Sequence, residues 1–240
     1  MNGSLCAFAS RVGSLVVGPL IIVLLAAASV QAQVTTLPSS LLFGQKYYLA
    51  FVTSGSISGT SANVADYDAF VQAQANLNGL GTISGVPVTW KALVSTPSVN
   101  AITHLGISGS TPIFRLNDVQ IASGSADLWD GSLAAALSVD QFGNTLTLGT
   151  AWTGTQDNGL AYPTFELGTS TPIIGGPTGT TSVWLVAGSS PNSNTFRVYA
   201  FSQELTAVPE PASISMAIGG GLVTAAWTVR RRRAKRPATP

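Results

Sequence analysis

Residues 45–52 read Gln-Lys-Tyr-Tyr-Leu-Ala-Phe-Val, and this run decides the fold class of the 240-residue chain. Aromatic and β-branched residues predominate in it, which is typical of a β-strand. The segment that follows, residues 53–61, is made of Gly, Ser and Thr apart from Ile57, so we expect a loop there. A strand followed by a loop and then by a helical pattern indicates a mixed fold.

One clear helix is expected between Ser61 and Gly79. Ser61 is a suitable N-cap, and Gly79 can end the helix. Asp66 and Asp68 lie near its start, where the helix dipole favours anions. Apolar residues recur at helical spacing and predict one inward face: Val64, Tyr67, Phe70, Val71 and Leu77.

Further strands are expected at residues 86–94, 113–116, 119–122, 145–148, 183–187 and 196–205. Residues 117–118, Asn-Asp, predict a turn between two of these strands. Several strands with one main helix near the start predict a single β-rich domain of the α+β class. Its core is expected to contain Val64, Phe70, Val71, Trp90, Leu93, Trp129 and Trp152.

Charge and cysteine content exclude several classes of function. Charged residues make up 9% of the chain. Between residues 33 and 208, four basic residues stand against nine acidic ones, a net charge of −5. An acidic domain without a basic stripe argues against nucleic-acid binding. The single cysteine is Cys6, so residues 33–240 provide no disulfide and no thiol ligand for a metal.

The N-terminal 32 residues have the pattern of a secretion signal. Arg11 precedes an apolar run over residues 12–30, whose densest part is residues 20–28. Val30-Gln31-Ala32 fits a leader-peptidase site with cleavage between Ala32 and Gln33. The alternative is a retained membrane helix, although the dense run is short for a span. We therefore expect residues 1–32 to be a signal peptide, removed by signal peptidase.

The C-terminal end has three ordered features. Val208-Pro209-Glu210-Pro211 comes first and is followed by residues 212–229, which carry no charge. The third feature is a basic cluster made of Arg230, Arg231, Arg232, Arg233, Lys235 and Arg236. Eighteen helical residues would reach roughly 27 Å, close to the hydrocarbon core of a bilayer, and arginine stems can cover the shortfall. The four consecutive arginines are expected to stop translocation and to stay cytoplasmic, so residues 33–207 should form an extracytoplasmic domain.

Residues 208–236 resemble the PEP-CTERM sorting domain of bacterial exported proteins. The resemblance is carried by Val208-Pro209-Glu210-Pro211, by Gly219-Gly220-Gly221 within the apolar run, and by the block Arg230-Arg231-Arg232-Arg233. It implies recognition by an exosortase, a membrane protease that cuts near the Pro-Glu-Pro motif and passes the protein to the cell surface or extracellular matrix. The alternative is an ordinary single-span anchor, because an apolar run followed by arginines also stops translocation.

A second resemblance covers about residues 49–201. Its ordered landmarks are residues 49–54, 66–70, 89–96, 126–133 and 151–155, the last three of which contain Trp90, Trp129 and Trp152. This succession looks like bacterial surface domains related to endostatin and C-type-lectin-like folds. The cysteines that usually bracket such domains are absent, and no Glu-Pro-Asn or Trp-Asn-Asp sugar-binding signature is present. The resemblance therefore implies a fold and no set of sugar-binding residues.

Few residues of the middle domain point to chemistry. His104 is the single histidine, no Gly-x-Ser-x-Gly motif presents a nucleophile, and we expect His104 to lie solvated in a loop. One histidine and no mature cysteine do not make a zinc set. Asp127, Asp130 and Asp157 lie beside glycines and are calcium candidates, although such sequences are also ordinary turn formers. The tryptophans could provide a sugar-stacking platform, but at these positions we expect them to fill the core.

Taken together, the sequence predicts a non-enzymatic structural or interaction protein of the cell surface or extracellular matrix, with no cofactor and no metal. It would be membrane-anchored through residues 212–229 before processing. A lectin-like adhesion or glycan-binding module is the first alternative, with an extracellular polysaccharide as the partner. An extracellular hydrolase is the second.

A first prediction concerns the N-terminus. Mass spectrometry of the exported protein should find Gln33, or its cyclised form, as the first residue, because the apolar run ends in a cleavable Val30-Gln31-Ala32. An exported protein that still begins at Met1 or Asn2 would show that the segment is retained.

Overall fold

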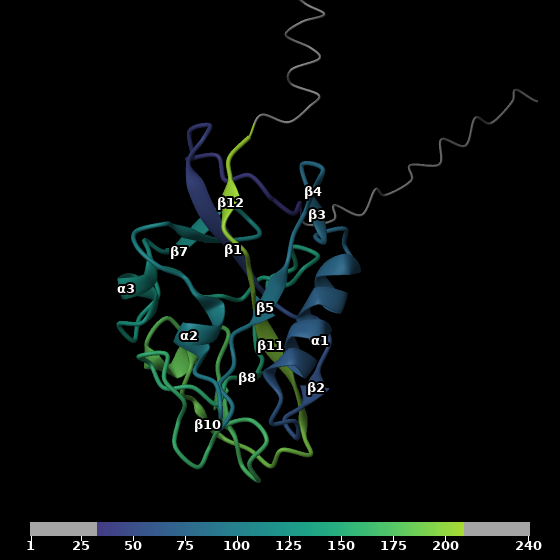
Figure 1. Ribbon diagram of the computed structural model, residues 1–240, viewed down its shortest axis with the longest axis vertical. Coiled ribbons are helices and arrows are strands. Elements are labelled where there is room, and N and C mark those ends of the chain that lie inside the picture. The colour runs from purple at the N-terminus through teal and green to yellow at the C-terminus, as the bar shows by residue number, and fades with distance from the viewer. Residues whose placement is uncertain (1–32, 209–240) are drawn as a thin grey trace, which may run out of the picture. The chain divides into compact units, whose positions relative to one another are not determined.

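The aromatic run near the start of the domain forms strand β1 (Lys46–Val52) of the computed structural model, which describes residues 33–208. β1 lies antiparallel to β11 (Thr195–Ser202), with Ala50 opposite Phe201. On its other side β1 is parallel to β6 (Ile113–Arg115), with Leu49 opposite Phe114. Two strands about 150 residues apart in sequence thus run side by side through the middle of the structure (Figure 1).

The fold is a mixed α+β fold with one large sheet and three α-helices in the described part of the chain. The main path of the sheet has the order β10-β9-β8-β11-β1-β6-β7, and β12, β2 and β5 pair beside it. The remaining strands are β2 (Ile57–Ser58), β5 (Trp90–Ala92), β7 (Val119–Ala122), β8 (Ala151–Trp152), β9 (Ile173–Gly175), β10 (Gly188–Ser189) and β12 (Leu205–Thr206). β3 (Thr82–Ile83) and β4 (Val86–Pro87) form a separate hairpin.

β1 is buried on both faces, which explains its nearly continuous apolar sequence. Successive side chains of a strand point to opposite faces. Leu49 and Phe51 enter one hydrophobic cluster, whereas Tyr48, Ala50 and Val52 enter a second cluster on the other face. The sheet therefore has a core on each side, and β1 contributes to both.

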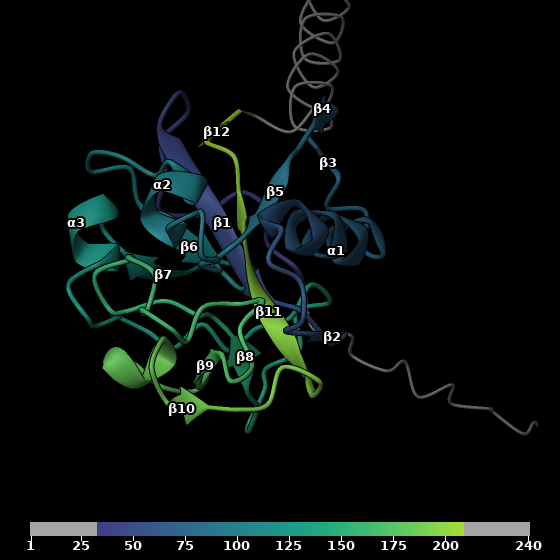
Figure 2. The ribbon, with the colours of Figure 1, turned by 60° about the horizontal axis from the view of Figure 1, so that its bottom comes forward.

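Helix α1 (Val64–Asn76) covers one face of the sheet (Figure 2). It buries Tyr67, Val71 and Ala75 against a cluster that includes Trp90. The helix is the one that the sequence predicts, but its N-cap is Asn63, whose side chain accepts the N–H of Ala65, and Ser61 lies two residues further out. The hydroxyl of Ser61 instead donates to Asp66.

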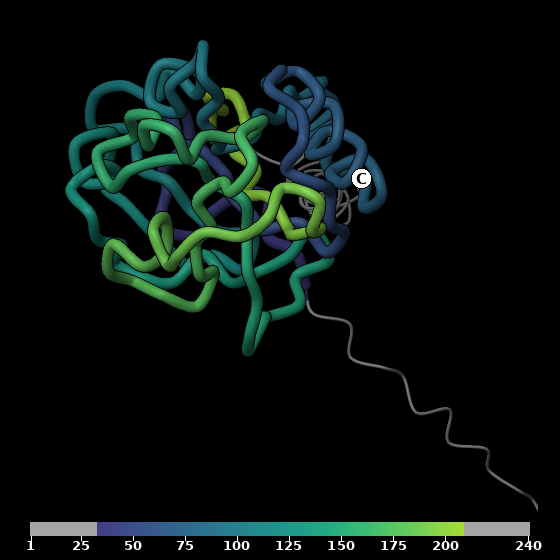
Figure 3. The backbone as a smooth tube through the Cα atoms, turned by 90° about the horizontal axis from the view of Figure 1, so that it is seen from below, coloured from purple at the N-terminus to yellow at the C-terminus, as the bar shows by residue number. Residues whose placement is uncertain are grey.

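The other face is covered by short helices and long loops. They comprise α2 (Ala101–Leu105), α3 (Ser125–Leu128) and the 3₁₀ helix η1 (Ser182–Trp184). Their apolar side chains, Leu105, Leu128 and Trp184 among them, join the second cluster. Figure 3 shows the teal and green loops gathered on this side, with the blue α1 on the opposite side.

Most of the expected core is confirmed. Val71, Trp90, Leu93, Trp129 and Trp152 are buried. Val64 and Phe70 are only half-buried, because they lie at the margin of the α1 face and pack against the cluster from outside.

Two expected strands are wrong. Residues 145–148 form no strand beyond an isolated bridge between Thr145 and Val139, and Leu148 lies exposed in a loop. Residues 183–187 belong partly to η1, where Trp184 turns into the core. A short apolar run fits a buried strand and a buried turn equally well, so its periodicity cannot separate the two.

No helix among residues 33–208 is long and apolar enough to cross a bilayer. The signal peptide predicted at residues 1–32 and the span predicted at residues 212–229 lie outside the described residues.

The two-sided burial of β1 generates a stability prediction. Leu49→Ala, at a fully buried position, should lower the free energy of unfolding by about 2–5 kcal/mol, because it removes packed methyl groups and leaves a cavity. Leu148→Ala makes the same chemical change at a side chain that is 83% exposed, so it should change stability by less than about 0.5 kcal/mol. Urea unfolding followed by tryptophan fluorescence measures both. If the two variants lose the same free energy of unfolding, the central placement of β1 is contradicted.

Candidate functional site

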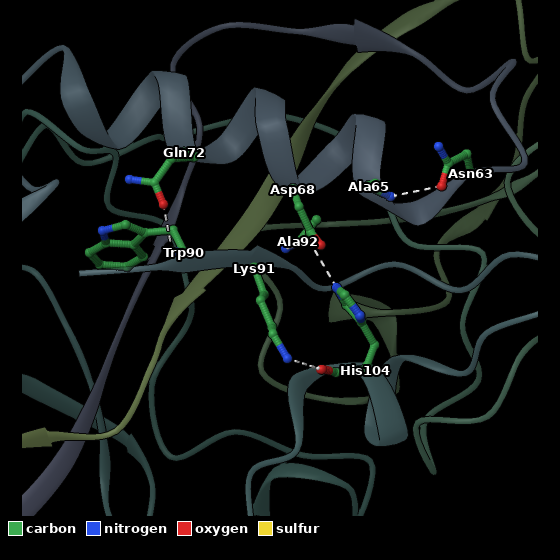
Figure 4. Close-up of polar contacts among 8 residues, drawn as sticks. All are labelled: Asn63, Ala65, Asp68, Gln72, Trp90, Lys91, Ala92 and His104. Carbon is green, nitrogen blue, oxygen red and sulfur yellow. Dashed lines mark hydrogen bonds and ion pairs between the residues drawn. The ribbon is translucent and has the colours of Figure 1, made fainter. Parts of the chain in front are cut away.

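Three polar side chains from three elements meet at one edge of the sheet (Figure 4). Asp68 comes from α1, Lys91 from β5 and His104 from α2. The Nε2 atom of His104 lies 2.9 Å from Oδ1 of Asp68 and donates to it, since a carboxylate oxygen only accepts. The ammonium of Lys91 donates to the backbone carbonyl of His104 at 2.7 Å. The group joins α2 to α1 and β5.

Asp68 has a second role that it shares with Gln72. The Oδ1 atom of Asp68 accepts the N–H of Ala92 at 2.8 Å, and the amide oxygen of Gln72 accepts the N–H of Trp90 at 2.9 Å. β5 pairs with β11 along one edge only, so these N–H groups lie on its outer edge. Two side chains one helical turn apart therefore accept hydrogen bonds from the outer N–H groups of β5, an edge that no further strand of residues 33–208 covers.

His104 is not the solvated loop residue that the sequence predicts. It lies in α2, and its side chain is largely buried against Asp68. Within residues 33–208, no hydrogen bond joins the His104 ring to a hydroxyl group. The arrangement fits a structural link between three elements and does not include the nucleophile that a Ser-His-Asp mechanism needs.

A hollow of about 300 Å³ lies next to this group, where Lys91 also forms part of the wall. Its charged wall contains Lys91 and Glu204, and Glu204 forms an ion pair of 2.6 Å with Lys46. The lining residues are Tyr48, Thr89, Lys91, Leu105, Gly106, Ser202, Gln203 and Glu204.

The phenol of Tyr48 stays protonated in this environment. Burial raises its pKa, the Glu204 carboxylate raises it further, and the Lys46 ammonium opposes the rise. The hydrogen bond and charge of Glu204 in turn raise the pKa of Lys46. The hollow thus offers a neutral phenol, a carboxylate, ammonium groups and small hydroxyls, which can hydrogen-bond a small polar molecule.

Of the three calcium candidates, Asp127 lies in the short helix α3, and Asp130 and Asp157 lie in turns or bends. Oδ2 of Asp127 accepts the backbone N–H of Ser123, and Oδ1 of Asp130 accepts both the N–H and the hydroxyl of Ser132. Asp157 lies beside Gly131, so the structure does bring residues 131 and 157 together. Over residues 33–208, no three His, Asp or Glu side chains gather closely enough to hold a metal ion.

The tryptophans of the described domain fill its core, as expected. Trp90, Trp129, Trp152 and Trp184 are all buried. The indole N–H of Trp90 donates to Leu80 and that of Trp152 to Ile57, both to backbone oxygens. None of these four rings offers the exposed face that a sugar-stacking platform requires.

The C-terminal edge of the domain is tied to the start of β1. Ala207 exchanges hydrogen bonds with the turn before β1: its carbonyl accepts the N–H of Gly44, and its N–H donates to Gln45, both at 2.8 Å. Val208, the first residue of the sorting motif, is exposed immediately afterwards. The predicted motif therefore begins at an exposed residue directly after the Ala207 contacts.

Most other residues predicted for sorting and processing lie beyond the described range. Gln33 is exposed at the start of the described chain. The residues outside it are Ala32 of the signal cleavage site, Pro209, Glu210 and Pro211 of the sorting motif, and Arg230, Arg231, Arg232 and Arg233 of the stop-transfer block. Their roles stay predictions from the sequence.

Sequence reasoning missed Asp68, Gln72 and Lys91 as a joint site. The available signal was the i, i+4 spacing of Asp68 and Gln72, which places both beside the apolar stripe of the predicted helix. Which strand they would reach depends on tertiary packing.

No protein-family model matches the chain, and no curated protein is significantly similar to it. The likeness to PEP-CTERM sorting domains and the likeness to lectin-like domains therefore both stay predictions.

The edge contacts generate a prediction for Asp68. Asp68→Ala should lower the free energy of unfolding by about 1–3 kcal/mol, because it leaves the buried N–H of Ala92 without an acceptor and frees His104. Asp66→Ala is the matched control, since Asp66 is exposed on the same helix and should contribute less than about 1 kcal/mol through the helix dipole. Urea unfolding measures the free energy of unfolding of both variants. If Asp66→Ala lowers it as much as Asp68→Ala does, Asp68 does not have the structural role assigned to it.

Proposed function

We propose that the chain is an exported cell-surface or extracellular-matrix protein that is sorted through its C-terminal end. On this proposal signal peptidase removes residues 1–32, and residues 212–229 anchor the protein in the bacterial membrane. An exosortase-type protease then recognises Val208-Pro209-Glu210-Pro211 and releases the domain. The domain itself has a non-enzymatic structural or interaction role.

One observation supports the proposal: the backbone of Ala207 is paired with the turn before β1, and Val208, the first residue of the motif, is exposed at the next position. Pro209 and Pro211 lack an N–H and so cannot donate to a strand ladder, and each disfavours the helical conformation of the residue before it. A protease at the membrane face would meet an extended peptide directly beyond the folded body.

The construction of the domain supports a role outside the cytoplasm. Residues 33–240 contain no cysteine, so neither thiol oxidation nor disulfide exchange affects the domain after export. Its stability comes from the two hydrophobic clusters on either side of the sheet. The net charge of −5 over residues 33–208 contrasts with the basic cluster that begins at Arg230.

The charge distribution also supports the orientation. The apolar run of residues 212–229 is followed directly by Arg230, Arg231, Arg232 and Arg233. Arginine is costly at the centre of a bilayer, and a bias of basic residues fixes the cytoplasmic side. The acidic domain before the run would then lie on the opposite side.

The motif and the anchor should be separable by mutation. Changing Pro209, Glu210 and Pro211 together to Ala should leave membrane insertion intact and block release, because the apolar run and the arginines are untouched. Changing all four arginines of residues 230–233 to Ser should instead weaken retention or scramble topology. Cell fractionation with an antibody against the folded domain measures both effects.

The matched control replaces Pro237 and Pro240 with Ala, which removes prolines outside the motif and should leave release unchanged. If the triple-Ala protein is released like the wild type, the motif is not the recognition element and the C-terminal end is only an anchor.

A further inference from the structure

Four exposed apolar side chains lie at the end of the domain where the described chain stops. Leu42 is 73% exposed, Phe43 68%, Val86 56% and Val208 41%. They come from three separate segments: the turn before β1, the β3–β4 hairpin and the end of the chain after β12. We call these four residues the exit face.

Hydrogen bonds hold the three segments together. The turn is bonded to the end of the chain through Gly44 and Ala207. Gln203, just before β12, exchanges hydrogen bonds with Thr89 and donates to Pro87 at the base of the hairpin. The turn, the hairpin and β12 lie at the same end of the domain in two views (Figures 1 and 2).

A hollow of about 220 Å³ lies between the hairpin and β12 and joins the Val86 and Val208 parts of the face. Val86 and Val208 both line it, together with the buried Leu205 and Ile83. The full lining is Tyr47, Ile83, Ser84, Val86, Gln203, Glu204, Leu205, Thr206 and Val208.

Tight turns fix the exposure of these side chains. Ser84 and Gly85, at the tip of the hairpin, both have positive φ (50° and 81°), as a two-residue hairpin turn requires. This turn leaves Ile83 in the core and its partner Val86 outside. Gly44, with φ of 87°, similarly follows Leu42 and Phe43 and reverses the chain into β1.

The length of chain beyond the face identifies its occupant. Three residues separate Val208 from Ala212, the start of the apolar run. Four Cα–Cα steps span at most about 14 Å when fully extended. The headgroup layer outside the hydrocarbon core is itself roughly 5–8 Å thick, so a domain tethered this closely cannot leave the membrane surface.

We propose that the exit face is a membrane-contact surface, in which Leu42, Phe43 and Val86 enter the boundary between lipid headgroups and acyl chains. Apolar side chains on fixed loops gain free energy at this boundary. The inference rests on the proposed function in one respect: residues 212–229 must lie in the membrane.

The test uses the proposed mature chain, residues 33–240, which lacks the apolar run of residues 12–30 and has no cysteine of its own. One introduced cysteine then carries an environment-sensitive fluorophore. Phe43→Cys and Val86→Cys place the label on the exit face. Leu148→Cys is the matched control, since Leu148 is 83% exposed and precedes β8, which pairs with the start of β11 at the other end of the sheet. The proteins are reconstituted in vesicles of phosphatidylethanolamine and phosphatidylglycerol that contain a headgroup spin-labelled lipid.

Labels at residues 43 and 86 should show blue-shifted emission and severalfold stronger quenching by the spin-labelled lipid than the label at residue 148. Adding Leu42→Ser and Phe43→Ser should weaken the quenching at residue 86, because the anchoring side chains are lost from an exposed turn without disturbing the core.

Three outcomes would overturn the inference. A chain that floats with the vesicles while labels 43 and 86 are quenched no more than label 148 refutes the contact surface and leaves the proposed anchor standing. A chain that does not float with the vesicles refutes both the contact surface and the proposed anchor. Emission shifts that depend on the protein-to-lipid ratio and not on the spin label identify a second copy of the chain as the occupant.

Discussion

The antiparallel pairing of β1 with β11 is the interaction on which the rest of the structure depends. It joins residues 46–52 to residues 195–202, so the sheet cannot form until nearly the whole domain is present. Thr53 secures the end of the pair, because its hydroxyl accepts the N–H of Val198 while its N–H donates to the Val198 carbonyl. Arg197 adds hydrogen bonds to the carbonyls of Thr53 and Ser54. Both strands bury side chains on both faces. β6 and β12 pair with β1, and β2, β5 and β8 pair with β11, so the large sheet grows outward from this pair.

The pairing also explains why the polar groups lie where they do. β11 pairs with β1 along one edge and with β5 along the other edge, and Ala200 and Phe201 take part in both pairings. The outer edge of β5 then receives its hydrogen-bond acceptors from α1. Asp68 and Gln72 supply the acceptors, and His104 and Lys91 attach α2 to the same place. Their contacts are those of a fold in which side chains of a helix accept hydrogen bonds from an open strand edge.

The sequence predicted the elements whose local pattern agrees with their tertiary setting. The apolar stripe of α1, the strands β1, β6, β7 and β11 and the burial of Trp90 and Trp152 follow from periodicity and residue type. β8 and β9 have two and three residues, too few to show a period. β8 forms because β11 offers it an edge, and β9 pairs in turn with β8. The Asp68–His104 contact joins residues 36 positions apart, and a single sequence contains no sign of such a pair. The hollow beside Lys91 could therefore not be predicted. A prediction for the processing residues at the two ends was possible, because a protease recognises a short contiguous stretch of sequence.

The proposed sorting motif directly follows the contacts that tie β12 and Ala207 to the start of β1. β12 and Ala207 close the sheet against the start of β1, and the two prolines that follow cannot extend it. The most direct measurement is the mass of the C-terminal peptide of the protein recovered from the native cell surface or medium. We expect a C-terminus within residues 208–211, directly after Ala207, whose backbone pairs with the turn before β1. A recovered protein that still ends at Pro240 would contradict sorting by cleavage.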